Sequence, residues 1–355
     1  MGMITELTHR CPLQCAYCSN PLAMDAVKDE LTTEDWCRVL DEAAALGVLQ
    51  VHFSGGEPMA RRDLVALVRH ASAAGLYTNI ITSGVLLSDA AMADLLAAGI
   101  DHIQLSLQDS GAGESDRFGG YRGGHAKKLE AARRIREAGL PLTANFVVHR
   151  QNVERVDEMI ALGEELGAER IEIAHVQYYG WALLNRNALL PSREQLERTN
   201  VIVAAARTRL SGRIAIDYVV PDYYAARPKA CMGGWANRFI NISPSGKALP
   251  CHAAETLPGF TFPSVREHSL ASIWAKSDAF RRFRGTDWMP ELCRSCDQRE
   301  IDWGGCRCQA LAIAGDAAAT DPACARSPDH HWMADAIAEA ENAPLDLIPR
   351  RLQHN

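Results

Sequence analysis

The sequence predicts an α/β fold, a partial TIM-like barrel of six β/α units followed by an irregular, cysteine-rich C-terminal domain. Three observations predict it. Strand-like and helix-like segments alternate from residue 3 to about residue 220, and glycines follow several helix-like segments. Beyond residue 230 strong helical patterns stop, and Cys, Gly, Pro and Trp become frequent. Alternating β/α units form a parallel sheet, which right-handed crossovers curl into a barrel.

Six segments have the composition of buried parallel strands. They are Ile4–Leu7, Val48–Phe53, Tyr77–Thr82, His102–Leu107, Leu142–Val148 and Arg170–Val176. In the fourth, apolar residues alternate with Gln104 and Ser106. A closed eight-stranded barrel fills its interior with branched apolar side chains. The alternation therefore favours an open barrel whose polar lumen can hold a ligand.

Helical periodicity separates these strands. The expected helices are Glu34–Leu46, Asp63–Ala74, Asp89–Ala98, Ala126–Ala138, Val153–Leu166 and Arg193–Leu210. Gly75, Gly99, Gly139 and Gly167 stand where helix should turn to strand. Residues 241–249 predict a short hairpin with a Ser-Gly turn, and one amphipathic helix is expected after about residue 333.

Composition excludes several classes of partner. The chain has 355 residues and a net charge of −7 without a long basic run, so nucleic acid is not an expected partner. It has no run of eighteen apolar residues and no signal-peptide pattern, so we expect no membrane association and a cytoplasmic protein. Eleven cysteines are many for a reducing compartment, where clustered cysteines indicate metal ligation rather than disulfides.

Cys11, Cys15 and Cys18 form a C-x3-C-x2-C motif directly after the first strand. Three thiolates can hold three irons of a [4Fe–4S] cluster and leave the fourth iron open to a chelating substrate. The alternatives are three buried cysteines or a zinc site, for which His9 could be a fourth ligand. The segment Ser54-Gly-Gly-Glu-Pro58 follows the second strand, and its glycines allow a ligand to approach the backbone.

Together these motifs resemble the radical S-adenosylmethionine (SAM) superfamily. The resemblance implies a SAM-binding [4Fe–4S] cluster on the three cysteines and reductive cleavage of SAM to a radical that abstracts hydrogen from a substrate. It also implies SAM contacts at Tyr17, Gly55, Gly56, Glu57, Pro58, Ser83, Ser106 and Arg117. For Ser83, Ser106 and Arg117 the alternative is ordinary strand or loop polarity.

The C-terminal cysteines resemble the SPASM domain of peptide-modifying radical SAM enzymes, which carries two auxiliary iron–sulfur clusters. The resemblance assigns Cys231, Cys251, Cys306 and Cys308 to the first auxiliary cluster, and Cys293, Cys296 and Cys324 to the second. Asp302 stands where many SPASM domains have a cysteine, so it is either a carboxylate ligand or a turn cap. Spacing alone also allows zinc at these cysteines.

Nearly the whole chain is similar to the PqqA peptide cyclase family, through 6–11, 174–181, 220–224, 251–255 and 302–308. That similarity implies C–C bond formation between Glu and Tyr side chains of the PqqA precursor peptide in pyrroloquinoline quinone biosynthesis. It also implies the peptide chaperone PqqD and an electron donor such as flavodoxin or ferredoxin as partners. Other SPASM maturases, acting on sulfatases or ribosomal peptides, and a non-enzymatic metal-binding or electron-carrier protein stay open.

Three parts are expected: a radical SAM barrel in residues 1–220, a SPASM domain in residues 221–332, and a C-terminal helix and tail in residues 333–355. Five polar and aromatic residues stand at the end of the sixth strand: His175, Gln177, Tyr178, Tyr179 and Trp181. They either line a closed cavity that keeps a radical from water or pack the domain junction.

Overall fold

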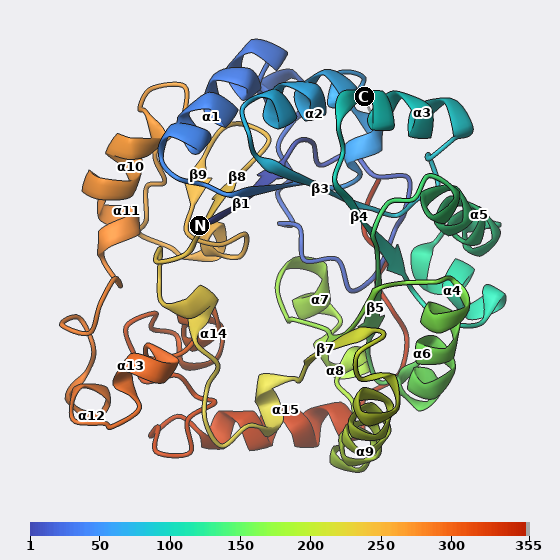
Figure 1. Ribbon diagram of the computed structural model, residues 1–355. Coiled ribbons are helices and arrows are strands. Elements are labelled where there is room, and N and C mark those ends of the chain that lie inside the picture. The colour runs from blue at the N-terminus through green and yellow to red at the C-terminus, as the bar shows by residue number, and fades with distance from the viewer. Residues whose placement is uncertain (353–355) are drawn as a thin grey trace.

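A single curved sheet organises the computed structural model, which describes residues 1–352 (Figure 1). The strand order is β7-β6-β5-β4-β3-β2-β1-β8-β9. The strands are β1 (Gly2–Glu6), β2 (Gln50–Ser54), β3 (Tyr77–Thr82), β4 (His102–Leu107), β5 (Leu142–Val148), β6 (Arg170–His175), β7 (Ala215–Val219), β8 (Phe239–Ile242) and β9 (Ala248–Leu249). All neighbours pair in parallel except β8 and β9. Because β7 and β9 are the two edges, the barrel is open, as the sequence predicted.

Helices cover the outer face of the curved sheet in Figure 1. The barrel helices are α1 (Thr33–Ala45), α2 (Leu64–Ala73), α3 (Asp89–Ala98), α4 (Ala112–Gly119), α5 (Gly124–Glu137), α6 (Val156–Glu165), α7 (Gly180–Leu184), α8 (Arg186–Leu189) and α9 (Arg193–Leu210). Those of the C-terminal region are α10 (Leu270–Lys276), α11 (Asp278–Arg281), α12 (Glu291–Arg294), α13 (Arg299–Asp302), α14 (Arg307–Ala314) and α15 (His331–Glu341).

Local sequence accounts for how the barrel helices begin and end. At α1, Thr32 accepts a hydrogen bond from the Asp35 amide while the Asp35 side chain bonds back to the Thr32 amide, which forms a capping box. The α1 face that carries Trp36 and Leu40 is buried in the main core. Gly99 adopts a left-handed conformation (φ 85°) after α3, a position that strongly favours glycine.

The six predicted strands and six predicted helices all form, with boundaries shifted by no more than three residues. The structure adds β7 after α9 and the helix α4 between β4 and α5. The predicted hairpin is β8–β9, and β8 also pairs in parallel with β1, so the C-terminal region extends the barrel sheet. Within residues 1–352 no helix combines the length and apolar character needed to cross a bilayer.

Candidate functional site

A cavity of about 440 Å³ lies at the carboxyl ends of the parallel strands. Its wall combines the motifs that the sequence singled out. It is lined by Cys11, Cys15, Tyr17, Cys18, Gly55, Gly56, Ser83, Ser106 and further residues of β4 to β6. Ligands of parallel α/β folds bind at this end of the strands, so the position is that of an active site.

We call Cys11, Cys15 and Cys18 the cluster-loop cysteines. All three are free thiols that line the cavity. Burial raises the pKa of each thiol, that of Cys15 to about 11, and the cations Lys128 and Arg350 partly oppose this rise. Burial disfavours the charged thiolate form of a cysteine, and a bound metal cluster stabilises that form by its positive charge. Three unbridged thiols in one buried, partly cationic pocket therefore suit ligation of a metal cluster.

The glycines of Ser54–Pro58 bring this segment against the cluster loop. The Gly56 amide donates to the Thr8 carbonyl (2.6 Å) and the Glu57 amide to the Arg10 carbonyl (2.7 Å). A Cβ on Gly56 would lie 2.4 Å from the Arg10 carbonyl oxygen. Gly55, at φ 131°, has a conformation that L-residues rarely adopt. The glycines therefore allow two backbones to touch, in addition to lining the cavity.

Glu57 is fully buried and anchors the same segment to β3. Its carboxylate accepts from the Thr82 hydroxyl (2.7 Å) and from the Ser83 amide (2.8 Å) and hydroxyl. The Ser83 hydroxyl is therefore bonded to Glu57 while its residue lines the cavity. Pro58, also buried, begins the short turn of helix that follows.

Polar side chains project into the lumen from β4, β5 and β6. Glu172 accepts hydrogen bonds from Gln104 (3.0 Å) and Asn145 (2.6 Å), and burial raises the pKa of its carboxyl. Lys128, from α5, donates to the Ser106 carbonyl (2.8 Å), and burial lowers the pKa of its ammonium to about 8. The lumen is polar, as the alternation in β4 predicted.

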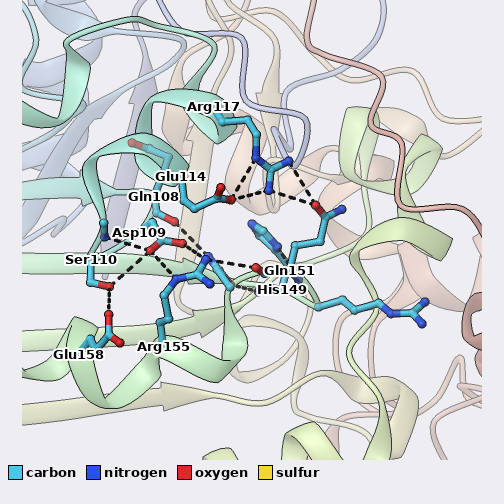
Figure 2. Close-up of polar contacts among 12 residues, drawn as sticks. Gln108, Asp109, Ser110, Glu114, Arg117, His149, Gln151, Arg155 and Glu158 are labelled. Carbon is cyan, nitrogen blue, oxygen red and sulfur yellow. Dashed lines mark hydrogen bonds and ion pairs between the residues drawn. The ribbon is translucent and has the colours of Figure 1, made fainter.

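Arg117 is not among the residues that line this cavity, and its polar contacts are shown in Figure 2. Its guanidinium pairs with Glu114 of the same helix and donates to Gln151 (3.3 Å), and its side chain is 48% exposed. Figure 2 also shows Asp109, buried beneath this pair, bound by Arg155. The structure thus brings Ser106 to the cavity but leaves Arg117 at the surface. A SAM contact at Arg117 stays a prediction.

The four cysteines predicted for the first auxiliary cluster lie together. The thiols of Cys231 and Cys308 each lie close enough to those of Cys251 and Cys306 to shift their pKa values. The Tyr179 hydroxyl lies 3.1 Å from the Cys306 Sγ. This arrangement joins residues 231–251 to 306–308 across the C-terminal region.

The residues predicted for the second auxiliary cluster share a different, smaller pocket. Cys293, Cys296, Asp302 and Cys324 all line it. Asp302 Oδ1 also accepts from the Gly304 amide (2.9 Å), so the carboxylate caps a turn while its residue lines the same pocket as the three cysteines. Across residues 1–352 no three His, Cys, Asp or Glu side chains are arranged as ligands of a single metal ion. Iron–sulfur clusters spread their thiolates over several irons.

Comparison with known proteins agrees with this geometry. The Radical SAM superfamily matches residues 5–163, and an iron-sulfur cluster-binding domain, SPASM, matches residues 231–297. The "PqqA peptide cyclase" of Granulibacter bethesdensis is 64% identical over 99% of this chain and 94% of its own. That of Rhodopseudomonas palustris is 61% identical over 97% and 91%, respectively. The chain belongs to the PqqA peptide cyclase family.

Solved structures with low sequence identity share the fold of this chain. Streptococcus suis SuiB bound to S-adenosylmethionine has a TM-score of 0.72 at 20% identity, over 92% of this chain and 76% of its own. The structure of anSMEcpe with bound AdoMet has a TM-score of 0.68 at 14% identity, over 96% and 95%. The chain is thus a radical SAM enzyme with a partial α/β barrel and a SPASM domain, and its cofactors are SAM and iron–sulfur clusters.

Of the residues at the end of β6, some line the cavity and others pack in the protein interior. His175 and Gln177 line the cavity. Tyr178 instead packs edge-on against Tyr223 (5.1 Å between ring centroids), in a core cluster that also contains residues of α15. Trp181 is buried. His175 and Gln177 therefore face the cavity, whereas Tyr178 and Trp181 are packed inside the protein, and a role in keeping a radical from water stays a prediction.

Sequence reasoning missed four residues at this site. Glu172, His252 and Arg350 line the cavity, and Lys128 lies close enough to Cys15 to influence its pKa. A signal for Glu172 was present, because it alternates with Ile171 and Ile173 in β6 just as Gln104 alternates in β4. Lys128 lies on an ordinary amphipathic helix, and Arg350 lies in a tail far along the chain, so local patterns carry no signal for either.

Proposed function

We propose that this protein is a radical SAM peptide cyclase that joins a Glu and a Tyr side chain of PqqA by a C–C bond in pyrroloquinoline quinone biosynthesis. Family membership supports the substrate. The observation that carries the mechanism is the single cavity in which the cluster-loop cysteines, the Gly55–Gly56 backbone and the polar lumen meet.

We assign the SAM cluster to Cys11, Cys15 and Cys18, and SAM contacts to Tyr17, Gly55, Gly56, Ser83 and Ser106, which all line that cavity. Glu57 and Pro58 contribute to SAM binding indirectly. The Glu57 carboxylate holds residues 54–58, which we call the glycine segment, to the end of β3. When bound, the SAM cluster and SAM supply a radical that takes a hydrogen atom from the peptide, and the auxiliary clusters supply an acceptor for the electron that leaves afterwards.

The chain's own residues supply hydrogen-bonding groups and an ionisable carboxyl to the cavity. Gln104, Asn145 and Glu172 line the cavity and offer hydrogen-bonding groups to a polar side chain of the peptide. Because burial raises the pKa of Glu172, its carboxyl is a better proton acceptor than an ordinary glutamate once it is ionised. The substrate loses one hydrogen atom, and later one electron and one proton, so the product is lighter by two hydrogens.

The cavity lies next to the first auxiliary set. His252 lines the cavity, and its neighbour Cys251 belongs to that set. The His252 ring also lies edge-on to Tyr179 (6.0 Å between centroids), whose hydroxyl contacts Cys306. We assign the first auxiliary cluster to Cys231, Cys251, Cys306 and Cys308, and the second to Cys293, Cys296, Cys324 and Asp302.

Family resemblance supports PqqD as the protein that presents PqqA, and a flavodoxin or ferredoxin as the electron donor. A cytoplasmic location is consistent with eleven free cysteines, since a reducing compartment keeps thiols available for iron. The division at residues 220 and 332 is proposed as functional, the barrel holding SAM and the second part holding the auxiliary clusters.

Mass spectrometry tests the function. The reconstituted protein is incubated anaerobically with SAM, a reductant, PqqA and PqqD. We expect 5′-deoxyadenosine and a peptide lighter by two hydrogens, with the cross-link between Glu and Tyr. An unchanged peptide alongside active SAM cleavage contradicts the substrate and favours another SPASM maturase.

A further inference from the structure

The last described residues form a tail, residues 343–352, that returns from α15 to the barrel. In Figure 1 this red segment runs from the lower edge of the molecule to the opposite side. Asn185 fixes the tail by two hydrogen bonds to the Ile348 backbone, at 2.7 and 2.8 Å. The backbone of Arg350 then pairs with Gln14, in the cluster loop, by two further bonds of 3.2 Å. The tail therefore has a defined path that ends beside the cluster-loop cysteines.

This path buries the Arg350 side chain, which is 1% exposed. Its Nη2 donates to the His9 carbonyl and lies 3.2 Å from the Met24 Sδ. Its Nε is buried without a hydrogen-bond partner among the described residues. The side chain lines the same cavity as the cluster-loop cysteines. An incompletely paired guanidinium in a secluded pocket is costly unless an anion lies nearby.

We propose that Arg350, carried to the cavity by the C-terminal tail, is a buried counter-charge for the iron–sulfur cluster at the cluster-loop cysteines and raises its reduction potential. The inference rests on the proposed assignment of that cluster. Three thiolates give the cluster a net negative charge that grows on reduction, so a nearby cation stabilises the reduced form. Arg350 lines the same cavity as the three cysteines, and Asn185 and Gln14 hold the tail there.

Lys128 is the second buried cation at this site, and it comes from α5. Lys128 donates to the Ser106 carbonyl, whereas Arg350 donates to the His9 carbonyl, so removing Arg350 leaves Lys128 in place.

Redox titration monitored by electron paramagnetic resonance tests the proposal on the reconstituted full chain, since it reads the cluster without needing turnover. Four proteins are compared: the wild type, Arg350→Gln, Arg350→Lys and the neighbouring control Arg351→Gln, whose side chain is exposed. We expect a more negative midpoint potential of the SAM cluster in Arg350→Gln and near wild-type values in Arg350→Lys and Arg351→Gln. The auxiliary-cluster signals should not move.

An unchanged potential in folded Arg350→Gln overturns the proposal. So does a shift of equal size in Arg350→Lys, because packing rather than charge then sets the potential. If Arg350→Gln does not fold, Arg350→Lys decides, since it keeps the charge and must keep the wild-type potential. Absence of a SAM-cluster signal in the reconstituted wild type, by contrast, contradicts the proposed function itself.

Discussion

Replacing Gly56 by alanine should detach the glycine segment from the cluster loop. The new Cβ would lie 2.4 Å from the Arg10 carbonyl oxygen and 2.6 Å from that of His9, both on backbone that cannot rotate away. Gly56 is not among the residues with positive φ, so alanine is conformationally allowed and the effect is steric. Overpacking of this kind costs about 1–3 kcal/mol. The shift should also weaken the 2.6 Å bond from the Gly56 amide to Thr8.

Anaerobic urea unfolding and iron analysis measure this effect on the reconstituted protein. Gly56→Ala should lose about 1–3 kcal/mol of unfolding free energy and a large part of its SAM-cluster signal, while the auxiliary signals persist. Gly113→Ala is the matched control, because nothing lies within 4 Å of its Cβ position in α4. It should be neutral or gain up to about 1 kcal/mol. Wild-type stability and cluster content in Gly56→Ala would refute the close-packing argument.

Three further predictions concern the auxiliary clusters and acid stability. Tyr179→Phe removes the 3.1 Å contact with the Cys306 Sγ and should lower the midpoint potential of the first auxiliary cluster, and an unchanged potential contradicts that role. Asp302→Ala should alter the spectrum of the second auxiliary cluster only, and an unaltered spectrum leaves Asp302 as a turn cap. His149 is fully buried, and burial lowers its pKa to about 3. Its contribution to stability is present above the unfolded pKa of about 6.5 and is lost as pH falls toward 3, so unfolding at pH 5.5 should cost about 1.4 kcal/mol less per such histidine than at pH 7.5. His149→Gln should show a shallower fall, and an equal fall contradicts the buried neutral state.

Most of the barrel could be predicted from sequence because each β/α unit is specified locally. The segment 33–45, for example, carries its own capping box, its apolar face and the glycine that follows. β7 was missed because Ala215–Val219 is a short edge strand with a mixed burial pattern. The pairing of β8 with β1 joins residues more than two hundred positions apart, which no local pattern encodes.

In the candidate site, too, the residues specified by local spacing could be predicted, and those placed by tertiary contacts could not. The cysteine motifs were predictable because ligand spacing is itself local chemistry, and the structure gathers the expected sets. Arg117 resembles a family ligand by position, but its nearest partners, Glu114 and Gln151, hold it at the surface. Arg350 reaches the cavity only because Asn185 and Gln14 fix the path of the tail, which is a consequence of tertiary contacts.

Iron and sulfide analysis of the triple variant Cys11→Ala/Cys15→Ala/Cys18→Ala tests the central assignment most directly. We expect it to contain about four irons fewer than the reconstituted wild type, to keep both auxiliary spectra, and to form no 5′-deoxyadenosine from SAM under reductant. Wild-type iron content in the variant, or continued SAM cleavage, would contradict the assignment of the SAM cluster to this loop.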